Sequence, residues 1–113
     1  MDYQIFQSCQ LGDVGISIIV AVVDPSGNPV DIRTASAKTI RLGYPDGSSK
    51  DFTAGFLTDG GDGQLVYIIQ AADLDQVGEF EVQGIIVMGG ATKSTRTSIF
   101  HVLDNIPAPV VEP

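Results

Sequence analysis

Hydrophobic and polar residues alternate along much of this chain with a period of two, which is typical of β-strands with one buried face. The middle of the chain, Lys38–Tyr67, contains three such runs; in the first, Ile40 and Leu42 alternate with polar residues. Pro45-Asp46-Gly47 follows and predicts a tight hairpin turn, because proline presets φ and glycine accepts the left-handed conformation. The glycine-rich segment Asp59–Gly63 separates the second run from the third. The middle of the chain is therefore predicted to be a β-meander.

The most hydrophobic strand is predicted over Ile16–Asp24. Both of its faces are apolar: one carries Ile16, Ile18, Val20 and Val22, and the other carries Ile19, Ala21 and Val23. A strand of this kind is central in a sheet or has one face covered by a neighbour. We expect a central strand whose second face contacts another subunit or domain, with burial in the protein's own core as the alternative.

A long strand is predicted over Glu79–Met88, with its aromatic and aliphatic residues pointing inward. Gly84 shares that inward face, where it leaves room for a bulky neighbour or marks a bulge. Gly89-Gly90-Ala91 should close a hairpin to a last strand over Lys93–Val102. Because the first half of this last strand is polar on both faces, we expect it at an exposed sheet edge.

In four segments the pattern of hydrophobic and polar residues is weaker. Tyr3–Ser8 is predicted to be a first strand, and Asp31–Ala37 a loop that crosses between sheets. A short helical turn is expected only near 71–76, where tertiary packing would hold it. Three prolines in Asp104–Pro113 favour an extended tail outside the domain.

About seven short strands, joined by turns roughly ten residues apart, predict an immunoglobulin-like antiparallel β-sandwich. A small closed barrel is the alternative architecture. The expected organisation is one sandwich over residues 1–103, followed by a proline-rich C-terminal tail over residues 104–113.

The composition of the chain excludes several functional classes. The chain has 113 residues and a formal net charge of −8, so it would repel nucleic-acid phosphates and anionic membrane surfaces. Its single cysteine, Cys9, excludes an intrachain disulfide framework and is compatible with assembly in a reducing cytoplasm. The N-terminus lacks the features of a signal peptide, and the longest apolar run, Ile16–Val23, is too short to span a bilayer. We therefore expect a soluble protein.

Asp59–Gly63 is the main candidate for a metal site. An EF-hand loop needs acidic residues at alternate positions and a bidentate glutamate at the twelfth. Here Gly61 takes a ligand position and Gln70 the closing one, so a hairpin turn is the better interpretation. Cys9 and His101 have no motif that would pair them as nucleophile and base, and they are too few for a structural zinc site. We expect Cys9 to be a small buried or near-surface residue and His101 an ordinary strand residue.

Acid–base chemistry has no better candidate. Glu79 and Glu81 share one strand face, but that face should point outward, where there is no cleft. Asp73 and Asp75 are expected to mark the start of the short helical turn and to be solvated. The chain has neither a nucleophile-elbow motif nor a phosphate-binding glycine motif. We therefore predict a protein that is not an enzyme and holds no metal or cofactor.

The order of several turn motifs resembles a known family. The motifs are Leu11-Gly12-Asp13, Val23-Asp24-Pro25-Ser26-Gly27, Lys38–Leu42 with Pro45-Asp46-Gly47, Thr58-Asp59-Gly60 with Asp62–Tyr67, Ala72-Asp73-Leu74 with Gly78-Glu79-Phe80, and Phe100-His101-Val102. In this order they resemble the immunoglobulin-like domains of tailed-bacteriophage structural proteins. Such domains occur at the N-terminus of the baseplate upper protein and in related tail and fibre-attachment proteins.

Two features depart from that family. Its domains usually adjoin a fibre or receptor-binding part, whereas this chain ends within about a dozen residues of the last strand, so we expect a stand-alone subunit. The corner after Leu74 should carry a tyrosine whose hydroxyl ties it to the backbone. Phe80 stands there instead, so we expect that corner to be packed and not hydrogen-bonded.

The resemblance implies a non-enzymatic virion protein of the tail, baseplate, neck or capsid surface, assembled in the host cytoplasm. Its expected partners are other virion proteins and copies of itself, with no nucleic acid and no membrane. The candidate interface residues are Tyr3, Ile5, Phe6, Ile19, Val23, Ile106, Val110 and Val111. Those in Tyr3–Phe6 and Ile106–Val111 would act as arms onto neighbouring subunits. The alternative function is a carbohydrate-binding or host-adhesion module, for which the chain offers three widely spaced tyrosines, Tyr3, Tyr44 and Tyr67.

Overall fold

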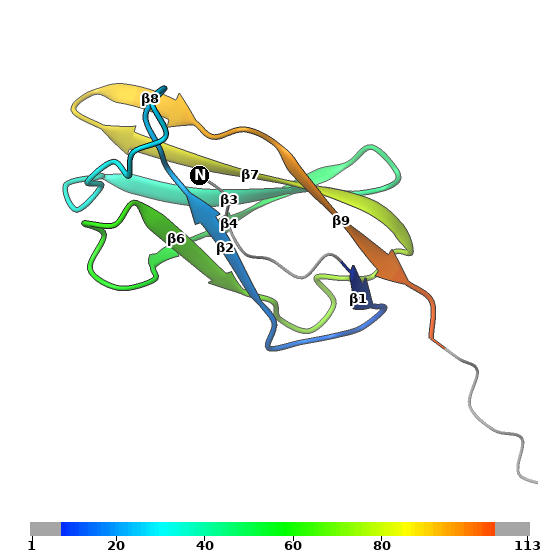
Figure 1. The fold of residues 1–113 in the computed structure, drawn as a ribbon. Coiled ribbons are helices and arrows are strands. Elements are labelled where there is room, and N and C mark those ends of the chain that lie inside the picture. The colour runs from blue at the N-terminus through cyan, green and yellow to red at the C-terminus, as the bar shows by residue number, and fades with distance from the viewer. Residues whose placement is uncertain (1–7, 106–113) are drawn as a thin grey trace, which may run out of the picture.

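The computed structural model describes residues 8–105, which form two β-sheets and contain no helix (Figure 1). The large sheet has six strands: β1 (Ser8–Gln10), β3 (Ala37–Gly43), β4 (Ser49–Thr53), β7 (Gly78–Met88), β8 (Ala91–Ser94) and β9 (Ser98–Leu103). The small sheet has three: β2 (Ser17–Ala21), β5 (Gly55–Phe56) and β6 (Gln64–Ile68). The all-β class predicted from the alternating pattern is therefore confirmed.

Strands of the large sheet follow the order β1-β9-β7-β3-β4, with β8 also pairing with β7, and the small sheet follows β2-β6-β5. The pairs are antiparallel except for β1 with β9, which is parallel. Residues 8–105 form nine strands where about seven were expected for the whole chain, because two of the predicted strands are each divided in two.

The first division changes the predicted meander. β3 and β4 form the expected hairpin around Pro45-Asp46-Gly47, where Gly47 has a φ of +89°. At the buried residue Ala54 the chain leaves the large sheet, and β5 pairs with β6 in the small one. The prediction of one continuous meander is therefore wrong. Alternation continues through Ala54, but it does not indicate which sheet the next residue joins.

The second division lies in the predicted last strand. β8 and β9 both pair with β7 but are separated by three residues, 95–97. Thr95 fills the gap: its N–H donates to the carbonyl oxygen of Gly84 at 2.9 Å, and its Oγ1 accepts from the Gly84 N–H at 2.9 Å. All four residues of β8 are exposed, which confirms the expectation of an exposed polar edge.

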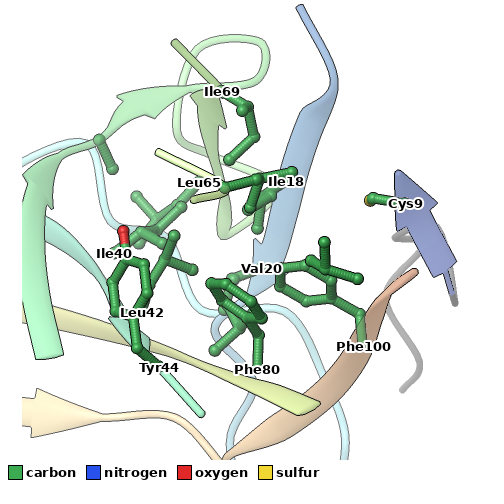
Figure 2. Packing of buried hydrophobic residues seen from close by; sticks show 14 of the residues in the cluster. Cys9, Ile18, Val20, Ile40, Leu42, Tyr44, Leu65, Ile69, Phe80 and Phe100 are labelled. Atoms are coloured by element: carbon green, nitrogen blue, oxygen red, sulfur yellow. The ribbon is translucent and has the colours of Figure 1, made fainter. Parts of the chain in front are cut away.

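Inward side chains of both sheets form one hydrophobic core (Figure 2). In the large sheet, the Phe80 ring lies 5.2 Å from Phe100 and 4.9 Å from Tyr44, measured between ring centroids. Val20 enters the core from the small sheet (Figure 2). A Cβ at Gly84 would lie 2.9 Å from Val20 Cγ1, so this glycine lets β7 and β2 approach closely, as the sequence predicted.

Within residues 8–105, β2 is an edge strand and not a central one. Among the described residues it pairs only with β6, which makes it an edge of the small sheet. Ile18 and Val20 point into the core, whereas Ile19 lies on the opposite face. The prediction of a central position is wrong because apolar residues on both faces indicate that both faces are covered, and say nothing about pairing at the two edges.

Residues 71–76, predicted to form a helical turn, are turns and bends instead. Ala72 has a φ of +69°, which is incompatible with a right-handed helix. The loop predicted over Asp31–Ala37 does cross between sheets, from β2 in the small sheet to β3 in the large one. Most of the predicted first strand and of the C-terminal tail lies outside the described residues.

Candidate interaction surface

The outward side of the small sheet is the strongest candidate for a functional surface. Ile19 on β2 lies directly opposite Val66 on β6, and Ser17 lies opposite Ile68. We call this side the uncharged face. Its residues are Ser17, Ile19, Ala21, Gly55, Leu57, Gln64, Val66 and Ile68.

Large apolar side chains on the uncharged face meet solvent. Ile68 is 41% exposed and Leu57 is 40% exposed, while Ile19 and Val66 are partly exposed. None of the eight residues is charged. An antiparallel sheet with one solvated side normally alternates apolar-in and polar-out. The small sheet departs from that pattern, and exposed apolar surface of this kind is typical of contact sites.

The outward side of the large sheet is different. It carries the exposed carboxylates Glu79 and Glu81, and the His101 Nε2 lies 3.7 Å from Glu79 Oε1. Arg41 donates to Asp51 at 2.6 Å, and this hydrogen bond lowers the pKa of Asp51. Apolar residues also occur here. Ile99 lies opposite Glu81, whereas Ile85 and Val87 are partly exposed and lie opposite uncharged residues of β3 and β8. A shallow pocket on this side is lined by Arg41, Gly43, Ser49, Glu81, Val82, Gln83 and Thr97.

Two of the predicted interface residues lie within the described part of the chain. Ile19 is on the uncharged face, and Val23 lies beyond the end of β2, where it bridges to Pro29. The other six, at positions 3, 5, 6, 106, 110 and 111, lie outside the described residues. Val66 and Ile68 were not among the predicted interface residues. The five consecutive apolar residues of Leu65–Ile69 were the signal, since they make a second strand apolar on both faces.

The candidate calcium loop is a turn whose carboxylates bind its own chain. Asp59 Oδ1 accepts from the Gly61 N–H at 2.8 Å, and Asp62 accepts from Gln64 N at 3.1 Å and Thr58 Oγ1 at 2.8 Å. Within residues 8–105, no three His, Cys, Asp or Glu side chains are grouped as metal ligands would be. The prediction of a turn is confirmed.

The corner between β6 and β7 is hydrogen-bonded, contrary to the prediction drawn from Phe80. The Tyr44 hydroxyl donates to the Asp73 carbonyl oxygen at 2.8 Å, and the Tyr67 hydroxyl donates to Asp73 Oδ2 at 2.5 Å. We call these three residues the Asp73 clamp. The expected tyrosine was at the start of β7, whereas the hydroxyls come from Tyr44, which follows β3, and from Tyr67 on β6.

Burial and the nearby Asp73 carboxylate raise the pKa of Tyr44 to about 12. Burial and the hydrogen bond to Asp73 raise the pKa of Tyr67 as well. The Tyr67 ring also stacks on Phe52, with 4.5 Å between centroids. Both tyrosines therefore have a structural role that accounts for their hydroxyls and for much of their ring surface.

Cys9 and His101 face opposite sides of the large sheet. Cys9 lies opposite Val102 in the β1–β9 ladder and is buried, and its burial raises the pKa of the thiol. His101 is the neighbour of Val102 on β9 and is exposed. The expected buried cysteine and ordinary strand histidine are confirmed, and they form no nucleophile–base pair.

No protein-family model matches this chain, and no curated protein matches it either. The part of the chain that the structure describes has no helix of the length and hydropathy needed to cross a membrane.

Proposed function

We propose that this protein is a non-enzymatic structural subunit of a tailed-bacteriophage particle. It is built as an immunoglobulin-like β-sandwich and acts through protein–protein contacts in the tail, baseplate, neck or capsid surface. Its partners are other virion proteins and copies of itself.

The strand order supports an immunoglobulin-like topology. In that fold, strands B, E and D are neighbours in one sheet, and strands G, F, C and C′ are neighbours in the other. We name β2 to β7 in chain order as B, C, C′, D, E and F, and we name β8 and β9 together as G. The small-sheet order β2-β6-β5 is then B-E-D. The order β9-β7-β3-β4 is then G-F-C-C′. This agrees with the fold implied by the family resemblance of the turn motifs.

The proposed contact function rests mainly on the uncharged face. Burial of apolar surface stabilises an interface by about 25 cal/mol per Å² removed from water. Ile68 and Leu57 are each about two-fifths exposed, so this gain is available only on contact with a partner. No comparable observation favours the carbohydrate-binding alternative, because Tyr44 and Tyr67 are engaged in the Asp73 clamp.

Mass spectrometry of purified particles of the phage that encodes this chain tests the proposal. We expect the protein in stoichiometric amounts in the particle. Replacing the wild-type gene with Ile68→Lys should reduce incorporation, whereas Ile99→Lys, on the outward side of the large sheet, should be incorporated normally. Absence of the chain from the particles would overturn the proposal. Specific binding of the isolated protein to a glycan array would favour the host-adhesion alternative.

A further inference from the structure

We infer that residues 1–7 add a strand to the edge of β2 that points away from β6, running antiparallel to β2 within the same chain. The surface concerned is a row of backbone groups, which the proposed function does not use. Tyr3–Phe6 then belong to the chain's own sandwich and do not reach a neighbouring subunit.

The hydrogen bonds around β2 show which of its backbone groups point outward. The Val22 N–H donates to the Gly63 carbonyl oxygen at 2.8 Å. At the other end of the strand, the Ile16 carbonyl oxygen accepts from the Ile69 N–H at 2.9 Å. Because these groups alternate in direction along an antiparallel strand, the even-numbered residues of β2 bond towards β6. The outer edge of β2 therefore consists of the N–H and C=O groups of the odd-numbered residues, which pair with no strand within residues 8–105: Ser17, Ile19 and Ala21.

The outer edge of β2 lacks the features that protect exposed sheet edges. Such edges usually carry charges, proline or a bulge, because an open row of N–H and C=O groups promotes pairing with another chain. The edge strand β4 of the large sheet carries Lys50 and Asp51. β2 has no charged residue and no proline. A segment of the protein's own chain is therefore expected to cover it.

The order of the strands places the outer edge of β2 on the same side of the sandwich as β1. β5 follows β4 after the single residue Ala54, so the β5 end of the small sheet lies over the β4 end of the large sheet. The opposite ends of the two sheets, which are β2 and the pair β9 and β1, therefore lie together. Residues 1–7 lead directly into β1.

The direction of β1 makes the added strand antiparallel to β2. The connection between β1 and β2 is tied to the connection between β6 and β7. The Gly12 N–H donates to the Leu74 carbonyl oxygen at 3.0 Å, and the Gly15 N–H donates to the Ile69 carbonyl oxygen at 2.8 Å. β1 therefore ends where β2 begins, and the chain that precedes Ser8 comes from the end where β2 finishes.

The length and sequence of the segment fit a short strand. At about 3.3 Å per residue, residues 1–7 span about 23 Å, and crossing between the sheets uses about 10 Å of this. About four residues are left to pair with the five of β2. Tyr3, Ile5 and Phe6 are strong strand formers, and the segment from 3 to 7 has no charge. Because the segment is tethered, its effective concentration is in the millimolar range, which favours it over a strand from another protein.

Amide hydrogen exchange of the full chain, followed residue by residue by NMR, tests this pairing. The amides of Ile18 and Val20 bond to β6 and serve as internal controls. Those of Ile19 and Ala21 bond to the added strand, so we expect them to exchange at least about 100-fold more slowly than unbonded amides. Nuclear Overhauser effects should connect residues 3–6 with Ser17–Ala21.

Two deletions of six residues provide a matched pair of variants. Deleting residues 2–7 should return Ile19 and Ala21 to the exchange rate of unbonded amides and leave Ile18 and Val20 slow. Deleting residues 108–113 should leave all four amides slow. Thermal melts verify that both variants are folded, and the Overhauser effects of the full chain decide the question if the first variant is not.

Two results overturn the inference. One is fast exchange of Ile19 and Ala21 in the full chain, which would show that residues 1–7 do not cover the edge. The other is protection that rises with concentration between 50 µM and 1 mM, with Overhauser effects between differently labelled chains, which would show that another copy supplies the strand. Both results leave the proposed function to its own test in purified particles.

Discussion

The large and small sheets bury similar aliphatic and aromatic side chains but differ on the sides that they turn outward. Over part of its outward side the large sheet presents Glu79, Glu81, Arg41 and Asp51, whose solvation suits exposure to water. The rest of that side, around Ile85 and Val87, is uncharged. The small sheet presents aliphatic and uncharged polar residues over its three strands. Because both sheets share one core, the need for burial within the protein does not explain this difference. The charge-free outward side of the small sheet is the basis of the proposed contact with a protein neighbour.

The sheets also differ in how they are held. In the large sheet, β3 pairs with β7 over seven residues. In the small sheet, β2 pairs with β6 over five residues and β5 with β6 over two. Contacts around the small sheet compensate for these short ladders: the turn at Gly63 packs on neighbouring backbone, and Tyr67 joins the Asp73 clamp. The small sheet should therefore be more sensitive to changes in its turns and corners.

The largest contrast should come from two glycines with left-handed backbone, Gly63 beside the small sheet and Gly47 in the large one. At Gly63, with a φ of +74°, a Cβ would lie 2.6 Å from the Val22 carbonyl oxygen. At Gly47, with a φ of +89°, it would meet nothing within 4 Å. Gly63→Ala should lower the free energy of unfolding by at least about 3 kcal/mol, since strain and a backbone clash combine. Gly47→Ala should cost only about 1–2 kcal/mol.

Urea denaturation of the two alanine variants measures this difference. Equal losses would contradict the claim that the turn at Gly63 is closely packed on its neighbours.

The next comparison is between the two hydrogen bonds of the Asp73 clamp, one donated from each sheet. Tyr67→Phe, in the small sheet, removes a hydrogen bond to a carboxylate and should cost about 1.5–3 kcal/mol of unfolding free energy. Tyr44→Phe, at the end of β3, removes one to a carbonyl and should cost about 0.5–1.5 kcal/mol. Urea denaturation curves with unchanged m-values would give both losses of unfolding free energy. A larger loss for Tyr44→Phe than for Tyr67→Phe would contradict the claim that the bond to the carboxylate is the stronger one.

A smaller effect should appear at alkaline pH. An unfolded tyrosine ionises near pH 10, whereas folding raises the pKa of Tyr44 to about 12 and also raises that of Tyr67. The stabilisation linked to these hydroxyls is thus fully present below pH 10 and is lost as pH rises above it. The urea midpoint should fall between pH 10 and 11.5, and less steeply in Tyr67→Phe. A midpoint that stays level over this range would show that the hydroxyls are not bound as described.

Much of the fold was predictable, because strand positions and turns depend on local chemistry. The hairpin at Pro45-Asp46-Gly47, the long strand that became β7 and the inward position of Gly84 followed from alternation and turn residues. The change of sheet at Ala54, the edge position of β2 and the break at Thr95 did not. These depend on pairing between residues far apart in the chain, which a local pattern of polarity does not encode.

The candidate surface was only half predictable. Ile19 was identified because β2 is apolar on both faces, but Val66 and Ile68 were not, since their strand was assigned to a continuous meander. The Asp73 clamp escaped prediction for a related reason. Tyr44 and Tyr67 are separated from Asp73 by 29 and 6 positions, and the corner motif was sought at a single position in β7.

We propose that the outward side of the small sheet contacts a protein partner in the particle. Mass spectrometry of particles assembled with Ile68→Lys or with Ile99→Lys in place of the wild-type gene is the decisive test. We expect Ile68→Lys to be depleted from the particles and Ile99→Lys to be present at the wild-type level. Equal incorporation of the two variants would contradict the proposal.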